Sequence, residues 1–175
     1  IDAQNAGITN IANVLAEEIE TEFPVEIEEY GLLQDTGGAG KYRGSLSQVR
    51  AVRCLADEGV LQLRSDKRLF PPYGLHGGKP GSPSWNILNP GPEQEILPAM
   101  GVTNMKRGDL IRHVMAGGGG WGDPRERDVE AVRQDVVEGL VSPQRARDVY
   151  GVAIAPDTYE VDEAETARLR ANARG

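Results

Sequence analysis

The sequence is poor in cysteine, histidine and aromatic residues: its 175 residues include one cysteine, two histidines and 5% aromatics. A single cysteine, Cys54, cannot form an internal disulfide, which excludes the disulfide framework typical of small secreted domains. This cysteine usage is compatible with a reducing compartment, and we expect a cytoplasmic protein.

Long apolar runs and clusters of basic residues are also missing. No apolar run approaches the roughly 20 residues that a transmembrane helix needs, and the start lacks the basic and apolar regions of a signal peptide. Nineteen basic and 27 acidic side chains give a net charge of −8, without a basic stripe that would suit nucleic acid. We therefore expect neither a membrane nor a nucleic acid as partner. Because the chain begins at Ile1, directly before a helix signal, we expect it to be a piece of a longer protein.

Glycine and proline are abundant instead, with 22 and 11 residues. They cluster between Gly37 and Gly122, which predicts many turns and long irregular loops. Apolar and polar residues alternate in several segments, and this alternation predicts strands at 25–30, 46–56, 60–66, 95–100 and 109–115. Residues 57–59 have the composition of a hairpin connection, and residues 106–109 that of a hairpin turn.

Helix signals flank this strand-rich part. Ile8, Ile11, Leu15 and Ile19 recur at helical spacing before Pro24. Later in the chain, residues with N-cap preference precede three helical patterns, at Asp128, Ser142 and Asp162. We therefore predict an α+β fold with three parts: an N-terminal helix (1–23), a mainly β body (24–122) and a small helical tail (123–175).

The first glycine loop, DTGGAGKYRG at residues 35–44, invites comparison with a phosphate-binding loop. A Walker motif requires glycine five residues before Gly40 and serine or threonine after Lys41. Asp35 and Tyr42 occupy those positions, so the spacing does not match. We interpret the segment as a wide β-turn with Lys41 and Arg43 in solvent.

The second glycine-rich stretch, HVMAGGGGWGDP at residues 113–124, is either a flexible linker or an ordered passage. Linkers are built from glycine and small polar residues, whereas Trp121 suggests a packed contact and Asp123-Pro124 a defined turn. We favour an ordered loop. Bare main chain at Gly117, Gly118, Gly119 and Gly120 then predicts close approach by another segment, a subunit or a ligand.

Residues 64–92 combine a charged cluster with a long loop rich in proline, glycine and large apolar side chains. Such loops, when ordered, tend to be functional. The candidate catalytic residues are His76 and Asp66, and the candidate substrate-binding residues are Arg64, Arg68, Gly77, Gly78 and Lys79. The competing interpretations are a solvated strand end and a structural histidine. His76 has no second ligand at metal-binding spacing, so we expect no metal site in this chain.

Taken together, the motifs GGAGKYRG, LRSDKR, PPYGLHGGKPG, NPG and GGGGWGDP, followed by GLVSPQRA and DVYGV, resemble the C-terminal part of the hydantoinase B family. That family comprises B-type subunits of ATP-dependent hydantoin and lactam hydrolases, the matching half of 5-oxoprolinases, and related subunits of acetone and acetophenone carboxylases. The resemblance covers nearly the whole chain. Val14-Leu15 departs from the helix start expected in the family.

The resemblance implies partners and cofactors outside this chain. B-type subunits work with an A-type subunit that binds ATP and magnesium and activates a carbonyl or carboxyl group by phosphorylation. Their divalent metal is associated with an N-terminal segment rich in histidine and aspartate, which has no match here. We therefore expect a hetero-oligomer with the N-terminal portion of the B-type subunit and with the A-type subunit. The isolated chain is predicted to lack hydrolase, carboxylase and ATPase activity.

Two functional hypotheses follow. In the first, the loops of this chain line the active site of a cyclic-amide hydrolase or of a carboxylase. In the second, the chain is a non-catalytic assembly module of such an enzyme.

Overall fold

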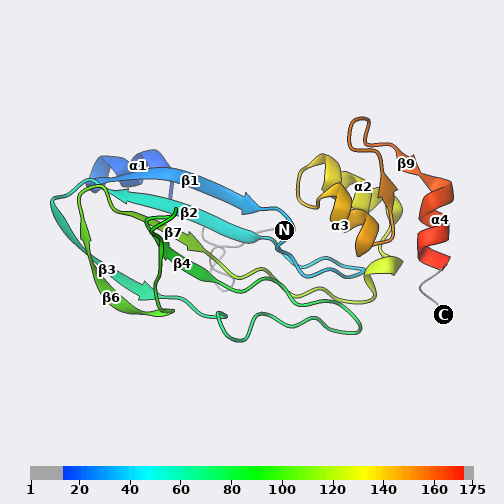
Figure 1. The fold of residues 1–175 in the computed structure, drawn as a ribbon, viewed down its shortest axis with the longest axis horizontal. Helices are drawn as coiled ribbons and strands as arrows, with labels where there is room; N and C mark the ends of the chain where they lie inside the picture. The colour runs from blue at the N-terminus through cyan, green and yellow to red at the C-terminus, as the bar shows by residue number, and fades with distance from the viewer. Residues whose placement is uncertain (1–13, 172–175) are drawn as a thin grey trace.

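Alternating apolar and polar side chains build an elongated β body, to which a smaller helical module is attached at one end (Figure 1). The computed structural model describes residues 14–171. The elements in chain order are α1 (Ala16–Glu22), β1 (Val25–Leu33), β2 (Ser47–Cys54), β3 (Glu58–Arg64), β4 (Trp85–Leu88), β5 (Glu95–Ile96), β6 (Met100–Lys106), β7 (Leu110–Val114), η1 (Pro124–Glu126), α2 (Val129–Val137), α3 (Pro143–Asp148), β8 (Ala153–Ile154), β9 (Val161–Asp162) and α4 (Glu163–Ala171). The predicted α+β class is confirmed.

The body contains a five-stranded antiparallel sheet in the order β1-β2-β7-β4-β5 and a two-stranded sheet of β3 and β6. Both predicted hairpins are wrong, because β2 pairs with β1 and β7, whereas β3 pairs with β6. The connections at 57–59 and 106–109 instead lie side by side and form a corner between the two sheets. The Cys54 N–H donates to the Asp109 carbonyl at 2.8 Å, and the Gly108 N–H to the Cys54 carbonyl at 2.8 Å.

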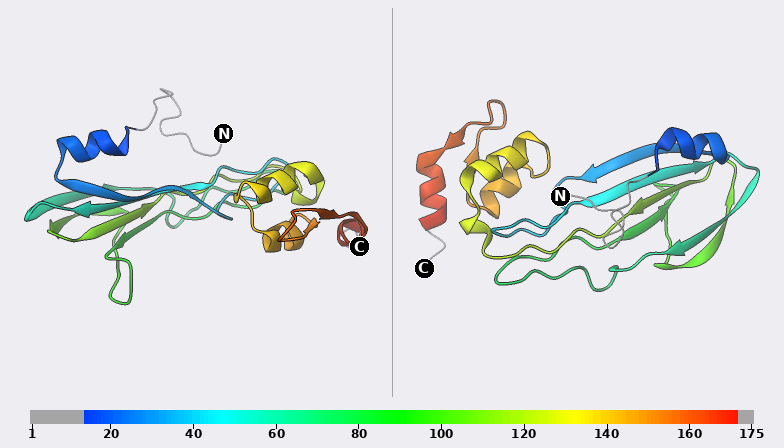
Figure 2. Two further views of the ribbon diagram at one scale, coloured as in Figure 1. Left: turned by 90° about the horizontal axis from the view of Figure 1, so that it is seen from above. Right: turned by 180° about the vertical axis from the view of Figure 1, so that it is seen from behind.

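The corner encloses a small apolar core. It consists of Cys54, Leu63, Leu97, Met105 and Ile111. The sequence pattern missed β4, whose WNIL segment lies within the predicted long loop, and it merged β5 with the start of β6. The helix α1 contacts β1 and lies over one end of the five-stranded sheet (Figure 2). Of the predicted N-terminal helix, Ile8 and Ile11 lie outside the described residues.

Between the sheet and the helices the chain passes back and forth in five extended segments, which we call the glycine bundle: residues 36–40, 42–45, 72–75, 78–82 and 117–122. Its segments bond to one another through main chain; for example, the Gly38 N–H donates to the Gly118 carbonyl and the Gly120 N–H to the Lys79 carbonyl, at 2.8 and 2.9 Å. The glycines permit this packing, because a Cβ on Gly119 would lie 2.0 Å from the Tyr73 carbonyl oxygen.

The glycine bundle tests two predictions from the sequence, the close approach at residues 117–120 and the turn at residues 35–44. The close approach predicted at residues 117–120 is present, and segments of this same chain make it. The segment 35–44 does turn back on itself, because the Gly44 N–H donates to the Gly38 carbonyl at 2.9 Å, and both of its halves also bond to residues 117–122. Three glycine-rich stretches that are far apart in sequence therefore fold as one unit.

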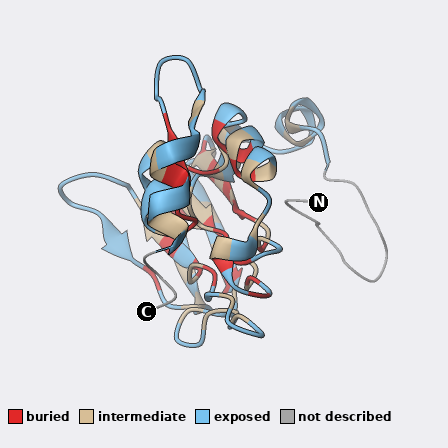
Figure 3. Ribbon diagram, turned by 90° about the vertical axis from the view of Figure 1, so that its right-hand side faces the viewer, coloured by how far each residue is buried: buried red, intermediate tan, exposed pale blue. Residues whose placement is uncertain are grey.

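The helical module begins after the bundle, and its helices start where local capping predicts. The side chains of Asp128, Ser142 and Asp162 accept hydrogen bonds from main-chain N–H groups three residues later. Buried residues lie mainly on the inner sides of the helices and in the segments behind them (Figure 3). This core contains Ala39, Val132, Val136, Val141, Ala146, Tyr150, Val152 and Ile154. Within residues 14–171, no helix has the length and apolar character needed to cross a membrane.

Candidate functional site

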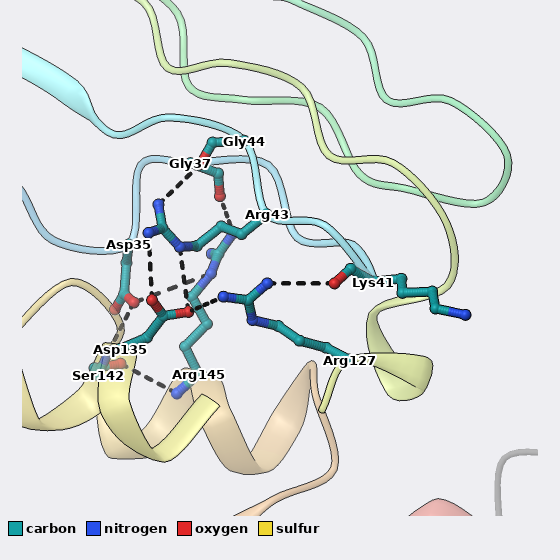
Figure 4. Close-up of polar contacts among 9 residues, drawn as sticks. All are labelled: Asp35, Gly37, Lys41, Arg43, Gly44, Arg127, Asp135, Ser142 and Arg145. Atoms are coloured by element: carbon teal, nitrogen blue, oxygen red, sulfur yellow. Dashed lines mark hydrogen bonds and ion pairs between the residues drawn. The ribbon is translucent and has the colours of Figure 1, made fainter. Parts of the chain in front are cut away.

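Two clusters of arginines adjoin the glycine bundle or the sheet, and the first joins the glycine bundle to the helical module (Figure 4). Arg43 from the bundle lies 3.3 Å from Asp135 of α2, measured from Nε to Oδ2, and Arg127 Nη2 lies 2.8 Å from the same oxygen. The side chains of Arg43, Arg127 and Asp135 are 8%, 15% and 9% exposed. The prediction that Arg43 lies in solvent is therefore wrong, whereas Lys41 is exposed and pairs with Glu126 at 3.5 Å.

A second set of contacts completes this cluster, which we call the junction cluster. The Asp35 carboxylate accepts from the Ser142 N–H at 2.8 Å and lies 4.0 Å from Arg145 Nε. Arg145 also donates to the Gly37 carbonyl at 3.1 Å. Each charged group faces an opposite charge or a main-chain partner, as Figure 4 shows. The junction cluster is therefore suited to holding the two parts of the molecule together.

The second cluster lies on one face of the five-stranded sheet. The strand registers align Tyr30 of β1 with Arg50 of β2, Arg50 with His113 of β7, and His113 with Asn86 of β4. Directly opposed residues on one face are close enough for their side chains to interact. The guanidinium of Arg50 lies 4.8 Å from the centre of the Tyr30 ring. Four polar side chains thus form a row across four strands.

Hydrogen bonds fix the orientation of Asn86, which is fully buried. Its Nδ2 donates to Ser65 Oγ and to the Pro98 carbonyl, both at 2.9 Å. Ser65 Oγ in turn donates to the Ala99 carbonyl at 2.9 Å, so its lone pair accepts from Asn86. The Asn86 Oδ1 atom must therefore face His113 Nδ1, which lies 2.6 Å away.

This network assigns the proton of His113. Because Asn86 Oδ1 is an acceptor only, His113 Nδ1 carries the hydrogen, and Nε2 is the nitrogen left for a ligand. Burial lowers the pKa of His113 below its usual value, and the positive charges of Arg50 and Arg68 lower it further. Near neutral pH the ring is therefore neutral, with Nε2 as a hydrogen-bond acceptor.

His113 and Arg50 line a cavity of about 330 Å³ between the sheet and β3. Arg64, at the end of β3, and Ser65 lie on its other side. The remaining lining residues are apolar or carry side-chain amides, and no described carboxylate lines the cavity. We call this cavity the arginine–histidine pocket. Within residues 14–171, neither Arg50 nor Arg64 makes an ion pair or donates a hydrogen bond through its guanidinium.

A neighbouring hollow of about 360 Å³ is lined by Asp66, Gly117 and Gly118 and shares Arg64 and His113 with the pocket. Arg68 lies behind the pocket. It donates to the Leu97 carbonyl at 3.2 Å and stacks over the Trp85 ring at 4.8 Å, but its Nε and Nη2 are buried without a hydrogen-bond partner.

The structure divides the predicted site residues into two groups. Arg64, Asp66, Gly117 and Gly118 line the pocket or its neighbouring hollow, and the charge of Arg68 reaches His113. The residues Gly119 and Gly120 lie inside the glycine bundle.

The second group lies at the other end of the bundle. The exposed ring of His76 packs against Trp121 with a centroid distance of 5.2 Å. Gly77 lies beside Asp123, and Gly78 packs on the Gly120 carbonyl. Lys79 is exposed. The structure therefore does not bring His76 together with Arg64 and Asp66.

Sequence reasoning missed Arg50, Asn86 and His113. A signal exists, because Arg50 and His113 interrupt the apolar positions of β2 and β7 that include Val52 and Ile111. No group of three or more potential metal-ligating residues occurs among residues 14–171.

Comparisons with known proteins place these features in a family context. The family model described as hydantoinase B/oxoprolinase matches residues 1–124. A putative D-/L-hydantoinase subunit of the B type from Pseudomonas sp. strain NS671 is 31% identical over 173 residues, which are 97% of this chain and 29% of that protein.

Two solved structures have similar folds. One is acetone carboxylase in its nucleotide-free form, with a TM-score of 0.76, 26% identity, and coverage of 92% of this chain and 26% of that chain. The other is the ATP-dependent caprolactamase from Pseudomonas jessenii, with a TM-score of 0.74, 28% identity, and coverage of 89% and 28%. The chain thus spans less than a third of the length of these relatives.

Proposed function

The chain belongs to the hydantoinase B/oxoprolinase family, and we propose that it forms the C-terminal portion of a B-type subunit of an ATP-dependent cyclic-amide hydrolase. The family match over residues 1–124 is the observation that carries this proposal. The similarity to a B-type hydantoinase subunit and to an ATP-dependent caprolactamase supports it. The working enzyme is then a cytoplasmic hetero-oligomer that contains an ATP-binding A-type subunit.

A second reaction class has equal support. The fold of acetone carboxylase, an enzyme of ATP-dependent acetone carboxylation, is as similar to this chain as that of the caprolactamase. The alternative proposal is therefore that the chain forms the same portion of an ATP-dependent carboxylase. In both cases ATP with magnesium is bound by the A-type subunit, and the divalent metal by the remainder of the B-type subunit.

Within such an enzyme we propose that the face of the sheet with Arg50, Arg64 and His113 lines the substrate path. Arginine forks suit carboxylates and polarised carbonyl groups, and a neutral histidine accepts or relays a proton. The opposite tip of the glycine bundle, with Tyr42, His76 and Trp121, exposes aromatic rings and suits contact with a partner chain. The isolated chain is proposed to be inactive.

The proposal is tested on the complete native assembly that contains this chain. Its subunits are identified by mass, and ATP hydrolysis is measured with hydantoin, 5-oxoproline or caprolactam, and separately with acetone and bicarbonate. ATP turnover that depends on a cyclic amide and yields the ring-opened acid supports the hydrolase. Turnover that depends on both acetone and bicarbonate supports the carboxylase. Isolation without an ATP-binding subunit, or no ATP turnover with any of these substrates, contradicts both and leaves the non-catalytic assembly module.

A further inference from the structure

We propose that the arginine–histidine pocket binds a small planar anion of the carboxylate class, held by the guanidinium groups of Arg50 and Arg64 beside Nε2 of His113. The site is defined by side chains of the described residues alone. It goes beyond the proposed function, because it does not depend on which reaction the complete enzyme performs. The arguments concern charge, size and the pattern of hydrogen-bond donors and acceptors.

The charge argument comes from a contrast between arginines of the same strands. On β2, Arg53 pairs with Glu28, and on β7, Arg112 makes two hydrogen bonds to Glu29 at 2.6 and 2.9 Å. Arg50 lies on β2 as well, only three residues before Arg53, yet no described carboxylate lines the pocket that it shares with Arg64. The nearby Asp66 lines the neighbouring hollow and makes no ion pair with Arg64. The chain carries 27 acidic residues, so carboxylates are not scarce. The positive charge of the pocket is therefore not neutralised by the side chains that line it and is available to a bound anion.

This positive charge is held at some energetic cost. Arg50 and His113 are partly buried, and the charge of Arg68, which lines neither cavity, also acts on His113. Removing cationic donors from water without compensation is unfavourable. An anion in the pocket supplies acceptors for the guanidinium groups of Arg50 and Arg64, and charge-assisted hydrogen bonds from arginine forks to a planar carboxylate are among the strongest in proteins.

The size of the pocket limits the ligand. A volume of about 330 Å³ is at the lower end of the range for small-molecule sites. The apolar lining includes Leu61, Leu63 and Ile111, which suits a short carbon chain beside the charged group. The pocket thus fits a small organic acid or a carbonate species.

The pattern of hydrogen-bond donors and acceptors distinguishes an organic carboxylate from a carbonate species. Neutral His113 offers only an acceptor at Nε2. Bicarbonate brings its own O–H group, which donates to Nε2 while its other oxygens accept from the arginines. An organic carboxylate has no hydrogen to donate, so it binds well only when Nε2 is protonated. Binding of a carboxylate is therefore coupled to proton uptake, and binding of bicarbonate is not.

The groups that face His113 set this pH dependence. They are Arg50 from β2, Arg64 from β3, and Asp66, Lys67 and Arg68 from the following loop. The Asp66 carboxylate accepts from the Lys67 N–H at 2.6 Å. Histidine is the side-chain type that changes charge near neutral pH, so His113 is the group expected to take up a proton when a carboxylate binds.

The experiment titrates the complete native assembly with [13C]acetate or [13C]bicarbonate at constant ionic strength, with chloride as the background anion. Binding is followed by broadening of the ligand signal in 13C NMR at about pH 6.5 and about pH 8.5, and bicarbonate concentrations are corrected for the carbon dioxide equilibrium. Four variants are compared with the wild type: Arg50→Gln, Arg64→Gln, His113→Gln and the matched control Arg53→Gln, whose guanidinium lies on the opposite face of β2. The melting temperature of each variant confirms that it is folded.

We expect saturable binding that weakens roughly tenfold or more in Arg50→Gln and Arg64→Gln and stays unchanged in Arg53→Gln. Acetate binding that tightens at the lower pH, and loses this pH dependence in His113→Gln, identifies an organic carboxylate as the source. Bicarbonate binding that is equal at both pH values identifies a carbonate species. The proposal is overturned if neither probe saturates, if both arginine variants bind like the wild type, or if Arg53→Gln weakens binding as much as they do.

Discussion

The junction cluster and the arginine–histidine pocket both contain arginines, but only the junction cluster contains a carboxylate that pairs with them. In the junction cluster, Arg43 and Arg127 both contact Asp135, and the three side chains are at most 15% exposed. In the arginine–histidine pocket, Arg50 and Arg64 face a cavity whose lining contains no described acidic residue. The same residue type therefore serves two purposes: the junction neutralises charge inside the protein, and the pocket keeps charge available.

This difference teaches where substitutions should affect stability and where they should affect function. Breaking a buried ion pair leaves an uncompensated charge and is strongly destabilising. An unpaired cation at the edge of a cavity contributes little to stability, and its removal is often neutral or favourable because functional sites are rarely optimised for stability. The following predictions test this division, from the largest expected effect to the smallest.

The glycine bundle lies between the junction cluster and the arginine–histidine pocket. A disruption of the bundle should therefore destabilise both regions together. In Gly119→Ala the new Cβ would lie 2.0 Å from the Tyr73 carbonyl oxygen and 2.7 Å from its carbon, both of which are main-chain atoms. We expect a loss of about 4 kcal/mol or more in the free energy of unfolding, or a failure to fold. Urea unfolding monitored by the fluorescence of Trp85 and Trp121 measures this.

The matched control is Gly31→Ala in β1, where a Cβ meets no atom within 4 Å. We expect this variant to unfold like the wild type, since its backbone needs no glycine-specific conformation. Equal stability of Gly119→Ala and the wild type would show that residues 117–122 are a flexible linker after all. The milder Gly118→Val variant tests the same point, because its Cβ would lie 2.8 Å from Ser45 Oγ.

The second prediction concerns the junction cluster alone. Asp135→Asn keeps the shape of the side chain but leaves Arg43 and Arg127 without their shared negative charge. We expect a loss of about 3 kcal/mol in the free energy of unfolding, while the pocket continues to bind its ligand. Glu130→Gln on the same helix is the control, because the pair of Glu130 with Arg133 is largely exposed. A similar small effect of both variants would contradict the assignment of the junction as a stabilising element.

The helical module shows how far local sequence determines structure. Asp128 and Ser142 cap α2 and α3 as predicted, because the donor and acceptor of an N-cap are only three residues apart. The burial of Arg43 was not predictable in this way, since its partner Asp135 lies 92 residues later. Local chemistry therefore placed the helices but not the ion pair that attaches them.

The pocket was only half predictable for a related reason. A charged cluster at a strand end indicates Arg64 and Asp66. Arg50 and His113 come together only through the pairing of β2 with β7, and strand pairing cannot be read from alternation alone. The predicted hairpins would separate them. The glycine-rich surroundings of His76 favour it as a functional histidine, yet it lies at the opposite end of the bundle.

The third prediction compares the two ends of the bundle by turnover of the complete assembly. We expect Arg64→Ala to lower kcat/KM at least tenfold, equivalent to about 1.4 kcal/mol of transition-state stabilisation, with assembly intact. His76→Ala tests whether the exposed tip also takes part. If kcat/KM falls tenfold or more in His76→Ala, the active site extends to that tip. Wild-type turnover in both Arg64→Ala and His76→Ala would show that neither residue takes part in the reaction.

The fourth prediction tests, through the free energy of unfolding, whether the charge of Arg50 in the pocket stabilises the protein. In Arg50→Met the apolar length of the side chain is retained while its charge is removed, so the stacking on Tyr30 is partly preserved. We expect the free energy of unfolding to remain the same or to rise by about 0.5 kcal/mol. Chemical denaturation of this variant beside Asp135→Asn makes the comparison direct. A loss as large as that of Asp135→Asn would show that Arg50 has a stabilising partner.

The smallest effect concerns the protonation of His113. Burial and the charges of Arg50 and Arg68 lower its pKa in the folded protein below the usual value of 6.5. Between the lowered pKa and 6.5, the unfolded chain therefore binds more protons than the folded one, so stability rises with pH across this window and falls as the solution is acidified. His113→Gln should lack this component, and the difference between wild type and variant in pH-dependent urea unfolding isolates it. Saturating acetate should reduce the acid-induced loss in the wild type, because a bound anion favours protonated His113. Identical pH profiles of the two proteins would show that His113 titrates as it does in the unfolded chain, and the positive charge of the pocket would then not reach its ring.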